Sequence, residues 1–285
     1  MTRRVLLLGS TGLLGSKVCS ILAENNQIEL ITTSRNDEKS TLKFDPISNN
    51  LELLLDETSP DYVVNCLGII PQDRARTIRN YIEMFQVNTF FARKLARAAN
   101  VRGIKVIQPQ TDGVFSGRRG GYSENSAKCP RSLYALSKIL SETKFESQIN
   151  LRCSFIGAEL SGKTKSLLSW VISRPAGAEI FGFTNHWWNG VTTLIFAKVC
   201  EYLIISNPKV PHTLHLVPRN SVTKFELLEL IAKYNSRSDL QVSPCVNRKT
   251  RDLRLTSIYE DSNILLWRGI GFTSAPTIEK MLALN

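Results

Sequence analysis

The stretch VLLLGSTGLLG, residues 5–15, decides the fold of this chain. Its first four residues are apolar and suit a buried strand, and residues 16–25 then have the composition of a helix. Between the two, glycine recurs at three-residue spacing. In such a turn Gly9 permits the bend, Gly12 lets the backbone approach a phosphate, and Gly15 lets the helix pack on the strand. The stretch therefore predicts a strand, a tight turn and a helix.

A helix that begins in a glycine turn presents free N–H groups at the positive end of its dipole, where an anionic group binds favourably. The pattern G-x-x-G-x-x-G has one more residue between its first two glycines than the common dinucleotide fingerprint G-x-G-x-x-G. A glycine turn that binds no ligand could have the same sequence. We expect this turn to bind the phosphates of a dinucleotide. The expected contacts are Gly9, Ser10, Thr11, Gly12, Leu13, Leu14 and Gly15.

Length and composition limit the classes of protein that remain. The chain has 285 residues, 42% of them hydrophobic, so one large or two modest domains can bury a full core. The net charge of +11 is scattered, with no aromatic–basic repeat, which favours small anionic ligands over nucleic acid. The six cysteines form no C-x-x-C pair and the three histidines have no metal-ligand spacing. No run reaches the roughly 18 apolar residues of a membrane span. We therefore expect a soluble, cytoplasmic protein with reduced thiols, no metal, and neither membrane nor nucleic acid as partner.

Apolar runs rich in Val, Leu and Ile alternate with helical patterns along the chain. The predicted strands are 28–32, 42–45, 62–66, 105–108, 149–156 and 213–217, and the predicted helices 51–58, 80–100, 166–172, 194–205 and 225–234. This alternation predicts an α/β, Rossmann-type, doubly wound parallel sheet. We expect residues 1–155 to form a nucleotide-binding domain to which 190–217 returns. Residues 156–189 and 218–285 are expected to form a smaller C-terminal substrate-binding lobe.

The end of the second predicted strand bears on the choice of cofactor. It reads Thr33-Ser34-Arg35 and contains no acid. An acid here would bind the adenosine ribose hydroxyls and repel a 2′-phosphate, whereas an arginine favours that phosphate. We predict NADP(H) in preference to NAD(H), with Ser34 and Arg35 at the ribose and Asp45 at the adenine edge. The alternative is that Arg35 is a solvated loop charge.

Tyr134 and Lys138 lie one helical turn apart and so share a face of a predicted helix. A phenol with its ordinary pKa of about 10 exchanges protons poorly at neutral pH. A neighbouring ammonium stabilises the phenolate and lowers that pKa. Thr111, at the end of a predicted strand, adds a hydroxyl. Y-x-x-x-K pairs are also common on exposed helices, where they carry no chemistry.

Four motifs, in order and at similar spacing, resemble those of the extended short-chain dehydrogenase/reductases, and most of all the dTDP-4-dehydrorhamnose reductase group. They are Gly9-x-x-Gly12-x-x-Gly15, Asn65-Cys66-Leu67-Gly68, Thr111-Asp112-Gly113-Val114-Phe115 and Tyr134-Ala135-Leu136-Ser137-Lys138, with Glu124 and Pro130 before the last. The resemblance implies that Tyr134 is the proton donor, that Lys138 lowers the Tyr134 pKa and holds the nicotinamide ribose, and that Thr111 orients the carbonyl. It also places Cys66, Leu67 and Gly68 along the cofactor.

The chain departs from this group at Gly113, where the group has an aromatic residue, and at Ser116, where it has Asp. The aromatic residue normally shapes the sugar pocket, so the identity of the sugar stays open. The resemblance implies that aromatic residues of 181–193 stack on the ligand; the alternative is that they pack within the protein. It also implies that an arginine of 247–254 contacts a pyrophosphate; the alternative is that this segment is a solvated basic loop. The resulting substrate-binding candidates are Asp112, Val114, Phe115, Trp187, Trp188, Asn189, Arg251 and Arg254.

The resemblance implies an NADPH-dependent reductase of a nucleotide-activated 4-keto-6-deoxy sugar, active in deoxysugar and polysaccharide biosynthesis and compatible with a homodimer. Two alternatives remain: an epimerase or dehydratase of the same superfamily, and a non-catalytic NADP-binding regulatory subunit, which Gly113 favours. A fourth reading rests on GAELSGKT, residues 157–164, which matches the phosphate-binding loop of P-loop proteins. Later apolar strands lack the acid that would hold magnesium, so we interpret this match as a surface turn.

Overall fold

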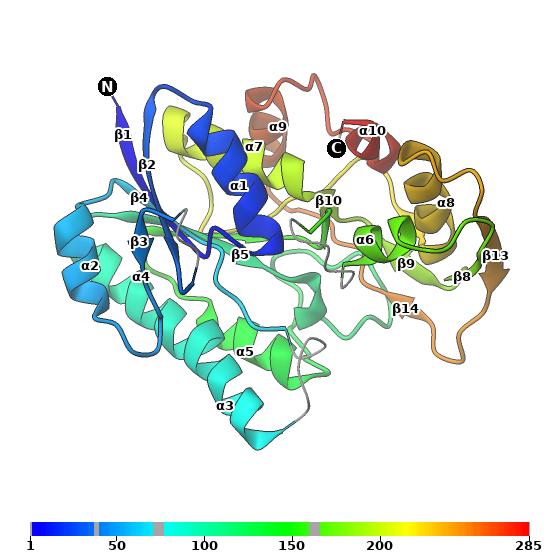
Figure 1. The fold of residues 1–285 in the computed structure, drawn as a ribbon, viewed down its shortest axis with the longest axis horizontal. Helices are drawn as coiled ribbons and strands as arrows, with labels where there is room; N and C mark the ends of the chain where they lie inside the picture. Colours follow the sequence, from blue (N-terminus) through cyan, green and yellow to red (C-terminus); the bar gives the residue numbers. More distant parts are fainter. Residues whose placement is uncertain (1, 37–39, 71–76, 160–165, 285) are drawn as a thin grey trace.

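The computed structural model describes residues 2–36, 40–70, 77–159 and 166–284. Within them, seven strands form one sheet in which every pair is parallel (Figure 1). The order across the sheet is β11 (Thr213–His215), β6 (Gln148–Arg152), β5 (Lys105–Gln110), β4 (Tyr62–Asn65), β1 (Arg3–Leu8), β2 (Ile28–Ser34) and β3 (Leu42–Lys43). The predicted Rossmann-type fold is confirmed. The strand order reverses between β1 and β4, and ligands of such sheets bind at that point, beyond the carboxyl ends of the strands.

Helices cover both faces of this sheet (Figure 1). One face carries α1 (Leu13–Ala23) and α7 (Thr193–Ser206), with α9 (Glu260–Gly269) packed on α7; the other carries α2 (Leu51–Thr58), α4 (Ala92–Val101) and α5 (Leu133–Ser141). The period of two in β1 explains this arrangement. Val5 and Leu7 pack toward α1 and α7, whereas Leu6 and Leu8 pack toward α2 and α4.

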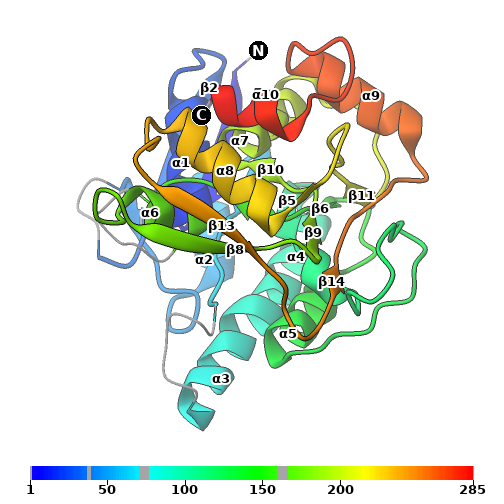
Figure 2. The same cartoon turned by 90° about the vertical axis from the view of Figure 1, so that its right-hand side faces the viewer.

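A second group of short elements lies beside the carboxyl edge of the sheet (Figure 2). Its strands are β7 (Phe155–Ile156) paired with β10 (Val191–Thr192), β8 (Glu179–Phe183) paired with β13 (Gln241–Cys245), and β9 (His186–Trp188) between β12 (Val222–Thr223) and β14 (Arg251–Asp252). Its helices are α6 (Leu167–Ile172), α8 (Lys224–Tyr234) and α10 (Ile278–Ala283). None of the helices in the described residues has the length and hydropathy that crossing a bilayer requires.

Two predicted elements differ from the observed ones in more than their bounds. The helix predicted at 80–100 consists of α3 (Ile78–Phe85), a π-helical turn η2 (Gln86–Phe91) and α4. Such turns frequently occur at functional sites. The strand predicted at 149–156 ends at Arg152, and the chain then leaves the main sheet to form β7. The Gly162-Lys163-Thr164 part of the P-loop match lies outside the described residues.

Candidate functional site

A cavity of about 640 Å³ lies at the carboxyl edge of the sheet. Its walls follow the ends of four neighbouring strands, β1, β4, β5 and β6, and so occupy the point at which the strand order reverses. The lining residues are Thr11, Gly12, Leu13, Leu14, Asn65, Cys66, Leu67, Gly68, Ile70, Pro109, Gln110, Thr111, Tyr134, Lys138, Cys153, Ser154, Phe155, Glu159 and Ser166. Ten of the predicted cofactor and catalytic residues are among them: Thr11, Gly12, Leu13, Leu14, Cys66, Leu67, Gly68, Thr111, Tyr134 and Lys138.

The glycine turn has two glycines that the fold requires and one, Gly12, where a Cβ would make only an ordinary contact. Gly9 has φ +79°, and a Cβ on Gly15 would lie 2.1 Å from the Gly9 carbonyl oxygen. A Cβ on Gly12, in contrast, would have its nearest neighbour at 3.6 Å. Nothing within the described protein therefore explains a glycine at position 12, whereas close approach of a ligand would.

The start of α1 also fits an anionic ligand. Gly12 is its N-cap and supplies no side-chain hydrogen bond, whereas Ser132 and Thr192 cap α5 and α7 with their hydroxyls. The first turn, Leu13 and Leu14, lines the cavity. Because the first N–H groups of a helix lack partners within the helix, a phosphate in this cavity would find both hydrogen-bond donors and the positive end of the helix dipole.

The residues predicted to contact the adenosine lie away from the lining described above. Ser34 is buried at the end of β2, and Arg35 follows it with half of its side chain exposed. The Arg35 guanidinium lies 3.8 Å from the Glu83 carboxylate. The Asp45 carboxylate accepts a hydrogen bond from the Ile47 N–H at 2.8 Å, which closes a local turn.

Thr111, Tyr134 and Lys138 meet in the cavity because the end of β5 lies beside the start of α5. Ser132 starts α5 by accepting a hydrogen bond from the Ala135 N–H, and this places Tyr134 and Lys138 one turn apart. Thr111 follows the last residue of β5. The Lys138 ammonium donates to the Pro109 carbonyl oxygen at 2.8 Å, and this hydrogen bond connects α5 to β5.

The protonation of Tyr134 differs from the sequence expectation. Burial raises its pKa to about 12, with a further contribution from the Asp112 carboxylate. Burial also lowers the pKa of Lys138 to about 8, against the opposing effects of Glu142 and Cys66. The expected lowering of the Tyr134 pKa by Lys138 is therefore not found: burial and the Asp112 carboxylate raise this pKa, and the Lys138 ammonium is directed to a backbone carbonyl. Tyr134 carries its proton at neutral pH.

Asn88, which the sequence analysis did not single out, links two segments that border the cavity. From the buried side of η2 it accepts a hydrogen bond from the Ile69 N–H at 2.8 Å and donates to the Ile69 carbonyl oxygen at 3.0 Å. It also donates to the Ser137 hydroxyl at 3.2 Å. Asn88 thus joins the chain beside Gly68 to α5 between Tyr134 and Lys138. A polar residue among the apolar positions of the predicted 80–100 helix was the signal available in the sequence.

Most of the predicted substrate contacts have other partners. Val114 and Phe115 are buried, and Phe115 stacks on Tyr122 with ring centroids 4.6 Å apart. Asn189 uses both ends of its amide on the backbone of Leu255, at 2.8 and 2.9 Å. These three side chains are therefore held by contacts within the protein.

Of the predicted tryptophan and arginine contacts, all but Arg251 have partners within the described protein. Trp188 is 4% exposed and packs in the core. Trp187 lies under the Arg254 guanidinium, at 4.8 Å, and Arg254 forms an ion pair with Asp252 at 2.5 Å. Arg251 is exposed and, among the described residues, has no side-chain hydrogen bond or ion pair.

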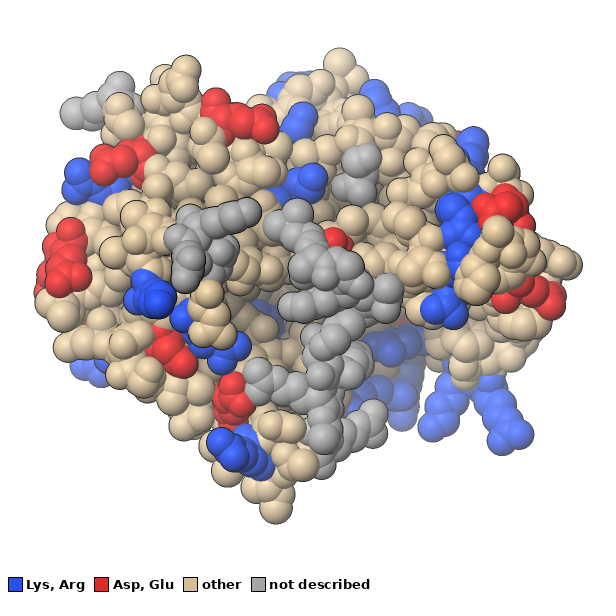
Figure 3. All heavy atoms as spheres, in the orientation of Figure 1, with Lys and Arg blue, Asp and Glu red and all other residues tan. Residues whose placement is uncertain are grey.

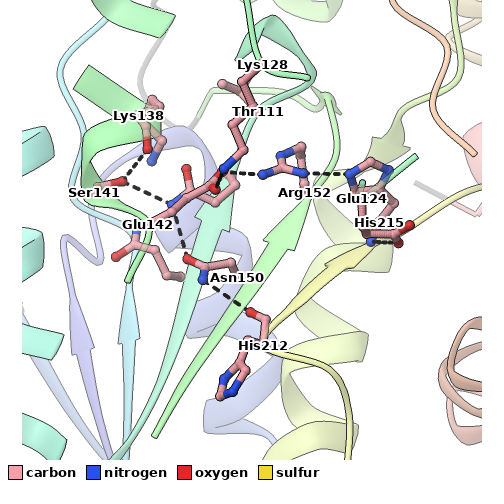
Figure 4. A network of polar contacts seen from close by, with 12 residues as sticks. Thr111, Glu124, Lys128, Lys138, Ser141, Glu142, Asn150, Arg152, His212 and His215 are labelled. Atoms are coloured by element: carbon pink, nitrogen blue, oxygen red, sulfur yellow. Dashed lines mark hydrogen bonds and ion pairs between the residues drawn. The ribbon is translucent and has the colours of Figure 1, made fainter. Parts of the chain in front are cut away.

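A buried polar network lies at the C-terminal end of α5, beginning at its C-cap residue Glu142 (Figure 4). Arg152 has no exposed surface, forms an ion pair with Glu142, and donates to the His215 Nε2 at 2.7 Å. Since an arginine only donates, the His215 Nδ1 carries the proton and donates to the Thr256 carbonyl oxygen at 2.8 Å. Burial, with Arg152 beside it, lowers the pKa of His215 to about 4. The network thus holds a neutral histidine and fixes the end of α5.

The described residues contain no group of three or more His, Cys, Asp or Glu side chains placed to hold a metal ion. The arrangement instead offers a phosphate cradle at one end of the cavity and a hydroxyl, a phenol and an ammonium at the other. This combination can hold an anionic cofactor and donate a proton to a carbonyl oxygen.

Comparisons with known proteins agree with this geometry. The family model described as "RmlD substrate binding domain" matches residues 3–176. Among curated proteins, the methionine adenosyltransferase 2 subunit beta of Danio rerio is 30% identical over 241 residues, 81% of this chain and 73% of that protein. The corresponding subunit of Bos taurus is 25% identical over 81% of this chain and 71% of that protein.

Solved structures show the same fold at lower identity. A dTDP-4-dehydrorhamnose reductase from Bacillus anthracis in complex with NADP matches with a TM-score of 0.77 and 21% identity, over 99% of this chain and 98% of that one. A dTDP-glucose 4,6-dehydratase from the same organism, in complex with NAD, matches with a TM-score of 0.74 and 15% identity, over 99% and 94%. The chain therefore belongs to the RmlD substrate-binding-domain family, within the extended short-chain dehydrogenase/reductases.

Proposed function

We propose that the chain binds a nicotinamide dinucleotide in the 640 Å³ cavity and reduces a nucleotide-activated 4-keto-6-deoxy sugar. One observation carries this proposal: a single cavity is lined by the glycine turn and by Thr111, Tyr134 and Lys138. The matches to solved structures that hold NADP or NAD support the choice of cofactor. The match to a dTDP-4-dehydrorhamnose reductase supports a keto-sugar nucleotide as substrate.

In this reaction the chain's own residues position the carbonyl and supply its proton. A bound reduced nicotinamide would supply the hydride. The Thr111 hydroxyl, which donates to the Asp112 carboxylate at 3.2 Å, turns to donate its hydrogen bond to the carbonyl oxygen and orients it. Tyr134, protonated at neutral pH, donates its proton to the same oxygen as negative charge develops there. The Lys138 ammonium, one helical turn away, stabilises the phenolate that remains and binds the hydroxyls of the nicotinamide ribose. A proton from solvent then restores Tyr134.

We further propose that NADP(H) is preferred over NAD(H). Arg35 follows the last residue of β2, where the adenosine ribose binds in Rossmann folds, and half of its side chain is exposed. At 3.8 Å, its pairing with Glu83 is loose enough for a 2′-phosphate to compete. Arg35→Gln is expected to weaken NADPH binding about tenfold and leave NADH binding unchanged. Equal losses for both cofactors would reject this role for Arg35.

We assign residues 1–155 and 190–217 to cofactor binding, and 156–189 and 218–285 to the sugar nucleotide. The return of β11 to the main sheet and the separate pairing of β8 with β13 support this division. The predicted sugar contacts then reduce to Asp112, Arg251 and the surroundings of Trp187, because the other candidates bind the fold itself.

The reductase activity can be tested directly. The protein is mixed with NADPH and a panel of 4-keto sugar nucleotides, beginning with dTDP-4-keto-6-deoxyglucose, while the absorbance of the reduced cofactor is followed and the product is identified by mass spectrometry. We expect NADPH oxidation with at least one member of the panel. Tyr134→Phe should bind NADPH normally and lose turnover, because only the phenolic proton is removed. NADPH binding without oxidation by any substrate would reject the proposal.

A second candidate is a non-catalytic, nucleotide-binding subunit. The curated relatives named above are beta subunits of methionine adenosyltransferase 2, and the Danio rerio protein is 30% identical over most of this chain. Gly113, in place of an aromatic residue at the sugar pocket, also favours this candidate. It predicts NADPH binding, no turnover, and a complex with a methionine adenosyltransferase in size-exclusion chromatography. An epimerase or dehydratase would instead retain its cofactor through purification and never consume it.

A further inference from the structure

A second cavity, of about 380 Å³, lies where the helices α1, α7 and α9 end. Its lining includes Asn25, which follows the C-cap of α1, Ser206, the last residue of α7, and Gly269, the last residue of α9. Asn207, the C-cap of α7, accepts a hydrogen bond at 2.7 Å from the hydroxyl of Tyr62, the first residue of β4. The cavity therefore lies at the amino edge of the sheet, opposite the 640 Å³ cavity, and the two have no described lining residue in common.

Two side chains of opposite charge line this cavity from the same helix. Lys198 and Glu201 lie three residues apart on α7, and both are half-buried. Lysine before glutamate is the less favourable order for pairing on a helix, and no ion pair joins the two within the described residues. We propose that the cavity binds a small zwitterion, an α-amino acid with an apolar side chain. Its carboxylate pairs with Lys198 and its ammonium with Glu201.

The Lys198 ammonium is available to an anionic group. In the part of the chain that the structure describes, it makes no hydrogen bond and no ion pair. Lys198 is nonetheless half-buried, on a helix whose inner face packs in the core, so part of its hydration is lost. A ligand carboxylate would supply acceptors for the ammonium and the opposite charge.

The Glu201 carboxylate is oriented, but its charge is not compensated. The Asn25 side-chain amide donates to Glu201 Oε1 at 2.7 Å, and the Gln27 N–H fixes that amide by donating to Asn25 Oδ1 at 2.9 Å. Both donors are neutral, and among the described residues Glu201 Oε2 accepts no hydrogen bond. Because three helices end here, their dipoles add partial negative charge at the same place. A ligand ammonium would offset this charge and donate to Oε2.

Apolar side chains complete the walls of the cavity. Tyr202, Ile205 and Ile270 line it and pack against the core. A Cβ on Gly269 would lie 2.4 Å from the Tyr202 ring, so a side chain at position 269 would displace that ring. The volume of about 380 Å³ lies near the lower end of the range of roughly 300–1,000 Å³ that small-molecule sites span. This size and these walls suit an amino acid with an aliphatic side chain better than a nucleotide.

The surface charge near these helices has no dominant sign. Figure 3 shows Lys and Arg side chains interspersed with Asp and Glu across the upper part of the molecule, where Figure 1 places α1 and α9. A surface of one sign would favour ligands of the opposite net charge, whereas a mixed surface favours neither. A zwitterion without net charge fits these surroundings.

Three probes with the same carbon skeleton separate the two charges. L-leucine carries both, 4-methylpentanoate lacks the ammonium, and 3-methylbutylamine lacks the carboxylate. Binding of each probe at concentrations up to the millimolar range is measured by calorimetric titration for the wild type, Lys198→Met, Glu201→Gln and Lys209→Met. Lys209 supplies the matched control because it is an exposed lysine just beyond α7. Thermal unfolding shows that each variant is folded.

We expect the wild type to bind L-leucine about tenfold or more tightly than either other probe, because each of those lacks one ion pair. Lys198→Met and Glu201→Gln should each weaken L-leucine by a similar factor, and Lys209→Met should bind it as the wild type does. Glu201→Gln should bind 4-methylpentanoate no more weakly than the wild type, since only the partner of the ammonium is lost.

A wild type that binds no L-leucine would overturn the proposal, as would unchanged L-leucine binding in Lys198→Met or Glu201→Gln, or an equal loss in Lys209→Met. A probe with one charge that binds as tightly as L-leucine would reject the zwitterion. The experiment needs neither a dinucleotide nor a keto sugar, so its outcome is separate from that of the proposed function. Binding of L-leucine without any reduction of 4-keto sugar nucleotides would keep this site and reject the reductase, and the reverse result would do the opposite.

Discussion

Substitution of Gly12 by Ala separates ligand binding from folding at the glycine turn. A Cβ at this position would have its nearest neighbour at 3.6 Å, and the Gly12 backbone, at φ −78° and ψ 169°, is accessible to alanine. We therefore expect a change in stability within about 1 kcal/mol. A dinucleotide whose phosphate approaches this backbone would meet the new methyl group and lose at least one charge-assisted hydrogen bond. Such a bond contributes about 1.5–3 kcal/mol, which corresponds to a roughly ten- to 150-fold weaker complex.

The assay is calorimetric titration of NADPH into the wild type, Gly12→Ala and Gly15→Ala, combined with thermal unfolding without ligand. Gly15→Ala is the matched comparison, because its Cβ would lie 2.1 Å from the Gly9 carbonyl oxygen and must displace backbone. It is expected to lower the free energy of unfolding by about 1–3 kcal/mol or more, in addition to losing NADPH binding. A Gly12→Ala protein that binds NADPH with wild-type affinity would refute the phosphate role of this turn.

Three further predictions concern α5 and the network behind it. Glu142→Gln removes the ion-pair partner of the fully buried Arg152, so urea denaturation should show a loss of about 3–5 kcal/mol; a loss below about 1 kcal/mol would contradict the pairing. His215 has a pKa of about 4 in the fold and 6.5 when unfolded, so the unfolded chain binds one more proton between these values. The contribution of His215 to the free energy of unfolding is then complete above pH 6.5 and falls by about 3 kcal/mol as the pH drops to about 4. Urea titrations of His215→Gln should show a flatter dependence of the free energy of unfolding on pH. Lys138 is charged below about pH 8, so the reduction rate should decline above that pH, and Lys138→Arg should move the decline upward; a rate independent of pH up to 10 would oppose this role.

Local patterns predicted the fold and the centre of the site. The apolar run of β1 and the glycine spacing that follows depend only on neighbouring residues, so the strand, the turn and α1 are readable from the sequence. The helix predicted at 51–58 forms with those bounds. Tyr134 and Lys138 share a helix face by spacing alone, and Thr111 joins them because carboxyl ends of parallel strands meet at one edge.

Contacts between distant segments could not be predicted in the same way. Asn189 was expected near a substrate, but it binds the backbone of Leu255, 66 residues away. The choice between Arg251 and Arg254 depends on which one Asp252 pairs with, and composition does not reveal this. The pKa of Tyr134 is raised chiefly by burial, and the burial of a side chain is set by the assembled fold.

We propose that one cavity holds a dinucleotide between the glycine turn and Tyr134. A crystal structure of the protein with NADP bound would show where the dinucleotide lies. We expect the pyrophosphate against the backbone of Gly12 at the start of α1, the nicotinamide beside Tyr134, and its ribose within hydrogen-bonding distance of the Lys138 ammonium. A dinucleotide bound elsewhere, or with its nicotinamide directed away from the Tyr134 hydroxyl, would contradict it.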